Sequence, residues 1–226
     1  MAEQKGKKLR QPKLVEDQLK PVTDAEEWLM ILETAAYEES AIENYWVKGL
    51  QFAEMDWHGL AIHNVLFTSC RFSGCHFKKA SFRQTVLRNC DISNCNFGDS
   101  YWDCCTLEEI KGPGLLWQES SLHHILFRHC QMRYANLTRA GLEFVQFEQC
   151  GLQEASFSAC KFKNCQWSES DLSKGDFFRA PLCNIDLSDC EISGIMVSDD
   201  FHELKGVTVN SFQAVELSKL LGLVVK

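Results

Sequence analysis

Two short segments carry side chains whose chemistry could support a metal site or a nucleophile. Asp103 and Cys104 form one pair, and His123 and His124 form the other. Thiolate, imidazole and carboxylate groups together bind soft metals such as zinc. A cysteine beside a histidine also suits nucleophilic catalysis, provided that a third group orients the base and a pocket receives the substrate. Either chemistry requires a fold that brings the two segments together.

The periodicity of the chain indicates what that fold is. A large apolar residue recurs at every fifth position from Ile62 to Val197, and only Gly112 interrupts the series. This period matches neither an α-helix, which repeats about every 3.6 residues, nor a flat strand, which repeats about every two. The chain must therefore turn a corner in each repeat.

A second column of residues, two positions before the first, is mostly small. Residues two apart in an extended segment point the same way, so both columns face inward. Such a repeat cannot bury its apolar side chains alone, and successive turns must stack. Burial in this narrow column explains ten of the twelve cysteines: Cys70, Cys75, Cys90, Cys95, Cys105, Cys130, Cys150, Cys160, Cys165 and Cys190.

The repeats themselves point to a known family. Runs such as Ala135-Asn136-Leu137-Thr138-Arg139 follow a pattern of small, polar, large apolar, polar and any residue. In this pattern the chain resembles the pentapeptide-repeat proteins. The resemblance implies an all-β solenoid, a right-handed quadrilateral parallel β-helix with about 20 residues in each coil. We expect about eight coils, with short helical caps at both ends.

Coils of that length place Asp103 and Cys104 beneath His123 and His124. We interpret these four as corner residues on a polar surface, because a solenoid filled by its own apolar columns offers no sign of a cavity. Phosphate-binding glycine loops and the H-E-x-x-H and G-x-S-x-G motifs are absent from the sequence. The sequence therefore predicts no catalytic residues, no metal, no cofactor and no enzymatic activity.

Charge is distributed unevenly along the chain, whose net charge is −8. Residues 1–13 carry +4, residues 14–60 carry −9 and residues 61–197 only −2. A nearly neutral solenoid lacks the field of an acidic DNA mimic, and the short basic segment is a weak contact, so we expect no direct specific binding to nucleic acid. Free cysteines without a C-x-x-C pair favour the reducing cytoplasm. No apolar run indicates a signal peptide or a membrane span.

We divide the chain into four segments. Residues 1–22 are expected to be a disordered basic tail. Residues 23–39 contain a capping-box sequence, Thr23-Asp24-Ala25-Glu26, and are expected to form a helix over 24–37 that covers the open end of the solenoid. A partner-binding arm is the alternative for this acidic segment. Residues 40–198 form the solenoid, and residues 199–226 form a C-terminal cap and dimerisation segment with Ser211 as a candidate helix cap.

The C-terminal third resembles a narrower group. Residues 170–177, Gln213-Ala214 and Leu220-Leu221-Gly222-Leu223 are similar to Qnr-type quinolone-resistance proteins. This resemblance implies a C-terminal homodimer that binds a type II DNA topoisomerase, gyrase or topoisomerase IV, and protects it from quinolones. The alternative is a general interaction scaffold with an unrelated protein partner. The expected dimer contacts are Phe212, Leu217, Leu220, Leu221, Leu223 and Val225.

One break in the repeat is a candidate for partner contact. It comprises Lys111, Gly112, Pro113 and Gly114, and Gly-Pro-Gly is a strong turn signal. The break preserves the register, because the residues before and after it remain in phase. It is either a bulged loop, which is where a rigid scaffold tends to carry function, or a tolerated defect.

Overall fold

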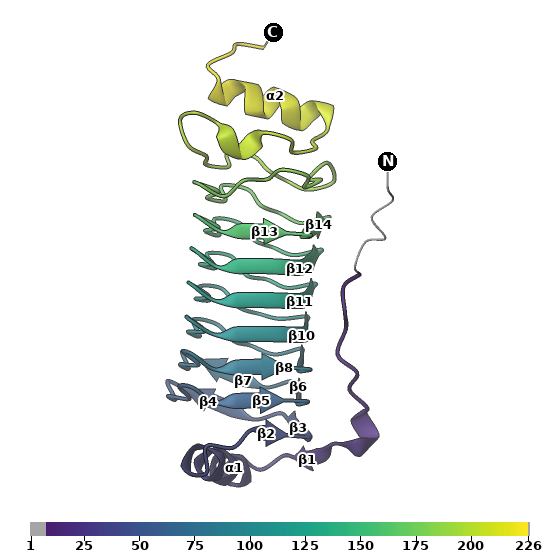
Figure 1. The fold of residues 1–226 in the computed structure, drawn as a ribbon, viewed down its shortest axis with the longest axis vertical. Helices are drawn as coiled ribbons and strands as arrows, with labels where there is room; N and C mark the ends of the chain where they lie inside the picture. The colour runs from purple at the N-terminus through teal and green to yellow at the C-terminus, as the bar shows by residue number, and fades with distance from the viewer. Residues whose placement is uncertain (1–7, 226) are drawn as a thin grey trace.

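The computed structural model describes residues 8–225, which form one column of stacked coils with a helix at each end (Figure 1). The strand pairs in this part of the chain are parallel, and the main path through the sheet runs β1-β3-β6-β9-β10-β11-β12-β13. Within the solenoid a residue pairs with the residue 20 positions later, as Trp102 does with Leu122 and Leu122 with Leu142. The predicted parallel β-solenoid is confirmed.

Most strands are short because a corner ends each side of the coil. Neither helix in the described part of the chain has the length and hydropathy needed to cross a bilayer. The elements have the following bounds: α1 Ala25–Tyr37, α2 Ser211–Leu220, β1 Lys20–Val22, β2 Ile42–Glu43, β3 Tyr45–Lys48, β4 Gln51–Ala53, β5 Ala61–His63, β6 Leu66–Thr68, β7 Arg71–Ser73, β8 Ser81–Arg83, β9 Val86–Arg88, β10 Tyr101–Glu108, β11 Ser121–Arg128, β12 Gly141–Glu148, β13 Lys161–Lys163, β14 Gln166–Ser168, and 3₁₀ turns at Glu16–Gln18 and His202–Leu204.

The corners are made by residues with positive φ. In the column that includes Gln84, Cys104 and His124, φ lies at 50°, 53° and 54°. Only glycine, and to a lesser degree asparagine, adopts this region readily, so each corner is unfavourable by itself. Hydrogen bonds between coils offset this cost: the N–H of Gln84, for example, donates to the carbonyl of Asp103 at 3.1 Å.

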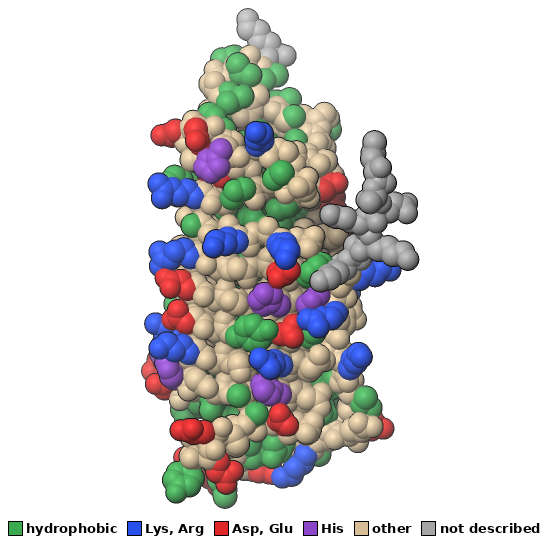
Figure 2. Space-filling model, in the orientation of Figure 1, with side chains coloured by type: hydrophobic (Ala, Val, Ile, Leu, Met, Phe, Trp, Pro, Cys, Tyr) green, Lys and Arg blue, Asp and Glu red, His purple; other side chains and the backbone are tan. Residues whose placement is uncertain are grey.

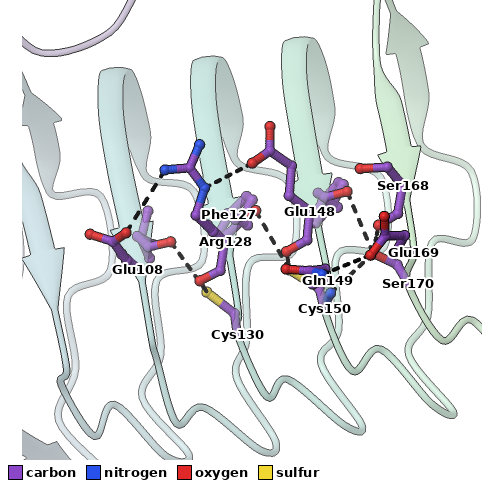
Figure 3. Close-up of polar contacts among 12 residues, drawn as sticks. Glu108, Phe127, Arg128, Cys130, Glu148, Gln149, Cys150, Ser168, Glu169 and Ser170 are labelled. Atoms are coloured by element: carbon purple, nitrogen blue, oxygen red, sulfur yellow. Dashed lines mark hydrogen bonds and ion pairs between the residues drawn. The ribbon is translucent and has the colours of Figure 1, made fainter.

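The inward columns form a continuous core. Phe147 stacks between Phe127 and Trp167, with ring centroids 4.8 Å and 5.3 Å away. In the small column the thiol of Cys150 lies 3.6 Å from the carbonyl oxygen of Phe127 (Figure 3). Burial raises the pKa of the Cys160 thiol to about 12, so this thiol stays protonated and unreactive. The columns therefore pack as the sequence predicts.

Helix α1 covers the N-terminal end of the core. The Asp24 carboxylate accepts a hydrogen bond from the N–H of Glu27 at 2.8 Å and so caps the first turn. Trp28, which is fully buried, places its ring edge-on to Tyr45 and Phe67 of the first coils. The acidic segment thus contributes an apolar face to the solenoid.

Two buried polar side chains close the C-terminal end. The Glu203 carboxylate accepts hydrogen bonds from the N–H groups of Arg179, at 2.7 Å, and Ser198, at 3.2 Å. The Gln213 amide donates to the carbonyls of Leu187 and Cys190 at 2.7 Å and 2.6 Å. These contacts satisfy backbone groups that no further coil reaches.

The N-terminal residue of α2 differs from the expectation. Asn210, not Ser211, is the N-cap, and it forms a reciprocal capping box with Gln213. The Gln213 side chain also donates a hydrogen bond to the last coil, and this contact fixes the position of the first turn of α2. The bond from the coil to Gln213, rather than the cap propensity of Ser211, selects the start of the helix.

The segment before α1 also differs from the expected disordered tail. Residues 1–7 lie outside the described residues, but residues 8–19 run along the outside of the solenoid (Figure 1). We call residues 8–19 the strap. Its Leu14 and Leu19 pack against Leu66 and Val86, and β1, which follows it, pairs with β3. Burial of these leucines and strand pairing explain why this polar, basic segment is ordered.

Replacing Phe147 with Ala is expected to lower the free energy of unfolding by about 3–5 kcal/mol, because it leaves a cavity between two stacked rings. Chemical denaturation followed by circular dichroism measures the change. The matched control is Gln146→Ala in the same strand, whose side chain lies outside and bonds to Gln166; its effect should stay within about 0.5 kcal/mol. Equal losses in the two variants would contradict the assignment of Phe147 to the core.

Candidate interaction surfaces

The outer surface carries columns of side chains that repeat with the coil. Arg88, Glu108, Arg128 and Glu148 occupy one such column and alternate in charge. Arg128 lies 2.8 Å from Glu148 and 3.8 Å from Glu108 (Figure 3), and Arg88 lies 3.2 Å from Glu108. Each exposed pair contributes little stability by itself. The alternation nevertheless cancels the field of the column, and Figure 2 shows basic and acidic side chains interspersed on the visible face.

Asp103, Cys104, His123 and His124 do lie on neighbouring coils, since Asp103 pairs with His123 between β10 and β11. They are not free corner residues, however, because the strap crosses them. His124 Nδ1 accepts the backbone N–H of Arg10 at 3.1 Å, and the Arg10 guanidinium pairs with Asp103 at 3.1 Å.

Two of these side chains are also buried, whereas we expected all four to be exposed on a polar surface. Cys104 is 2% exposed and His124 9% exposed. Burial raises the pKa of the Cys104 thiol, which keeps the thiol protonated and therefore poorly nucleophilic. His124 stacks on Phe144 with a centroid distance of 4.7 Å. Together these side chains form a contact surface for the strap.

The segment of residues 111–114 continues the solenoid without a bulge. Lys111 bridges to Asp91 and Gln131 in the ordinary register. A side chain on Gly112 would overlap Leu115 Cδ1, so the large Leu115, at a position where small residues are usual, fills the space that Gly112 leaves. The Lys111 ammonium lies 3.0 Å from Asp91 and is 65% exposed. The interruption is thus compensated in the core, while Lys111 remains accessible.

The C-terminal end exposes an apolar surface. Phe212 is 84% exposed, Leu221 60% and Val225 55%. Leu220 and Leu223 are exposed as well, whereas Leu217 packs against the core of the solenoid. Five of the six expected dimer contacts are therefore available to another molecule, and Leu217 instead holds α2 on the last coil.

A cluster that the sequence did not single out lies beside this cap. Among residues 8–225, Asp200, His202 and Glu203 bring possible ligand atoms within 4.8 Å of one another. The His202 ring links the two carboxylates, at 2.7 Å from Asp200 and 3.5 Å from Glu203. Hydrogen bonds from Ser198 and His202 lower the pKa of Asp200 to about 2. We interpret the cluster as a clamp on the cap, because Glu203 already accepts backbone hydrogen bonds. No periodic signal marks these residues in the sequence.

Comparison with known proteins identifies the same five-residue repeat. Residues 60–137 match a model described as a pentapeptide repeat region, and residues 150–189 match eight copies of pentapeptide repeats. No curated protein matches this chain. A trypsin-treated variant of QnrB1, a plasmid-mediated fluoroquinolone resistance protein, is similar at 22% identity and a TM-score of 0.37, covering 81% of this chain and 99% of that chain.

Another similar structure is HetL, a pentapeptide repeat protein involved in heterocyst differentiation regulation from the cyanobacterium Nostoc sp. strain PCC 7120. It is 15% identical, with a TM-score of 0.30, and covers 83% of this chain and 95% of that chain. Rfr23 from the cyanobacterium Cyanothece 51142 is 8% identical, with a TM-score of 0.25, and covers 81% and 99%. These similarities concern the fold alone.

The contact between the strap and His124 is expected to depend on pH. Burial and the nearby charge of Arg10 lower the pKa of His124, whereas Asp103 and Glu143 act in the opposite direction. The folded protein therefore favours the neutral ring, and stability falls as pH drops below the ordinary histidine pKa of about 6.5, where the unfolded chain takes up the proton more readily. Melting temperature measured from about pH 7.5 to about pH 5.5 checks this.

His124→Gln is the matched variant for that experiment. Its amide oxygen can accept the N–H of Arg10 but does not titrate in this range. The melting temperature of the wild type should therefore fall relative to that of the variant as the pH falls. A difference that stays constant with pH would contradict the role of His124.

Proposed function

Because this chain belongs to the pentapeptide-repeat family, we propose that it is a non-enzymatic scaffold that presents its outer surface to another protein. The observation that carries this proposal is the exposed apolar end formed by α2 and the residues after it, on a rod whose sides carry polar columns. Contiguous apolar surface of this kind is typical of protein–protein contacts. The right-handed quadrilateral path, as the family resemblance implies, is part of the proposal.

The same apolar end supports a homodimer. A surface that includes Phe212 and Leu221 and lies at one end of a rod suits an isologous contact, in which both copies use the same patch. The likeness of the C-terminal third to Qnr-type proteins favours the same arrangement. The dimer would be twice as long as one rod and would present the polar columns of both copies.

For the partner we propose a type II DNA topoisomerase, gyrase or topoisomerase IV, which the protein would protect from quinolones in the cytoplasm. The support is the sequence likeness of residues 170–177 and of the C-terminal segment to Qnr-type proteins. Lys111, Gly112, Pro113 and Gly114 are the proposed contact, since Lys111 is accessible there. The second candidate is an unrelated protein partner, which the balanced charge of the columns favours.

Gyrase supercoiling with and without ciprofloxacin tests the partner. Titration of this protein should restore supercoiling that the drug inhibits, because the bound scaffold would protect the enzyme. Lys111→Ala should weaken the rescue. Arg71→Ala is the matched control, since Arg71 pairs with the same Asp91 at 3.6 Å but lies outside the proposed contact. No effect with or without the drug would refute the topoisomerase as partner and favour an unrelated protein. Inhibition of supercoiling without rescue would indicate competition with DNA.

Phe212→Asp combined with Leu221→Asp should convert the dimer into a monomer, because two charges would be buried in an apolar contact. Light scattering coupled to size exclusion measures the mass. Glu216→Ala, a change on the same helix that removes no apolar surface, should remain dimeric. These point variants are preferable to deletion of the segment, since Gln213 closes the last coil. A wild-type protein that runs as a monomer at micromolar concentration would refute the dimer.

A further inference from the structure

The solenoid carries an apolar strip on its outside, where polar residues prevail elsewhere. Three outward residues, each directly after an inward-facing residue of its own coil, are buried. They are Leu66, Val86 and Leu126, at 1%, 8% and 2% exposed. They lie outside the main core; Leu66 and Val86 belong to a separate cluster with Leu19 of the strap. Phe144, 9% exposed, lies on the coil after that of Leu126 and extends the strip by one coil. Outward apolar side chains that are buried require a cover. The strap covers Leu66 and Val86 through Leu14 and Leu19, and its first described residues lie beside Phe144.

Few interactions hold the strap in place. Between residues 8 and 19 of the described chain, the backbone N–H groups that reach the solenoid are those of Arg10 and Lys13, and both bond to side chains, His124 and Gln84. The ion pairs that add to them are solvent-exposed, as in the Arg10–Asp103 pair, where Arg10 is 61% exposed. Such pairs contribute roughly 0–1 kcal/mol each. Regular strand pairing begins only at Lys20.

The space beside the strap continues past its first described residues. A groove of about 970 Å³ extends from Lys8 and Leu9 along Phe144 and Gln146 towards the last coils. Its far part carries the carboxylates of Asp186 and Asp189, and Glu148, which pairs with Arg128, lies nearer to the strap. A neighbouring hollow, which Arg10 enters, carries Asp103 and Glu143. The groove therefore combines an apolar floor with an acidic wall.

We propose that this strip, together with the groove that continues it past Phe144, is a docking site for an extended segment of a partner protein that carries both basic and aliphatic side chains, and that the strap occupies the strip until the partner displaces it. The chemistry of the strap defines the partner: Arg10 pairs with an acidic residue of the wall, and Leu14 contacts the apolar floor. The carboxylates beyond Lys8 add charge complementarity for a basic partner segment that is longer than the strap.

A peptide of residues 8–19 tests the groove directly. A variant that lacks residues 2–18 retains Leu19, β1 and α1 and uncovers the strip except where Leu19 packs on it. The labelled peptide should bind this variant and should bind the full-length protein about tenfold or more weakly, because the tethered strap competes at high effective concentration. Fluorescence anisotropy measures both affinities. Binding to the variant should weaken as salt increases, since part of it is electrostatic.

Three controls make the result specific. A variant that lacks only residues 2–7 keeps the strap and should behave as the full-length protein does. A peptide of the same composition in scrambled order should bind poorly, and Val86→Asp in the uncovered variant should abolish binding, because Leu14 packs on the cluster that contains Val86. Equal binding to the covered and uncovered proteins would overturn the proposal. So would an uncovered, folded protein that ignores the peptide or buries its strip against a second copy.

Point variants cover the case in which the deletion does not fold. Leu14→Asp should release the strap from the floor of the groove and increase peptide binding by the full-length chain. Val15→Asp makes the same chemical change at a side chain that is 47% exposed, and should have no effect. If both variants bind the peptide as weakly as wild type, the proposal fails. The experiment contains no topoisomerase, so its outcome is independent of the proposed function.

Discussion

Every coil of this protein can bury its apolar side chains only against the coils before and after it, and the rest of the structure depends on that constraint. The corners adopt positive φ at residues such as Cys104 and His124, a conformation that is unfavourable for an isolated peptide. Hydrogen bonds to the next coil and stacked rings such as Phe127 and Phe147 make it favourable in the column. The same register also aligns the outward side chains in columns, as in Arg88, Glu108, Arg128 and Glu148.

This periodic part of the fold was predictable from the sequence. The large and small columns identified the inward residues, because the orientation of a side chain repeats every fifth position. Predicting it requires no knowledge of contacts between distant parts of the chain. The strap was not predictable in the same way. Its polar composition resembles that of disordered tails, and its order depends on Leu66 and Val86, which are outward residues far along the chain. Nonperiodic segments that bind a repeat surface are determined by that surface rather than by their own pattern.

The candidate surfaces were likewise predictable where they follow the repeat and not predictable elsewhere. Sequence reasoning placed Asp103 and His123 on adjacent coils, which the register requires. It treated their neighbours as solvent-exposed, although Leu126 and Phe144 offered a usable signal: apolar residues at outward positions of successive coils indicate something that covers them. Glu203 and His202 carried no such signal, because their contacts depend on how the chain folds back over the last coil. The compensation between Gly112 and Leu115 likewise becomes visible only when the two side chains share one space.

The two ends of the rod are closed by different physical means, and this gives the molecule a direction. At the first coil, α1 inserts Trp28 into the aromatic core, so removing the helix would expose a large apolar area. At the last coil, the Glu203 carboxylate accepts backbone hydrogen bonds and the Gln213 amide donates them, and the adjoining helix leaves Phe212 in solvent. We therefore expect the column to unfold first from its C-terminal end under tension or in denaturant, so the contacts of the last coil would limit the mechanical strength of the rod.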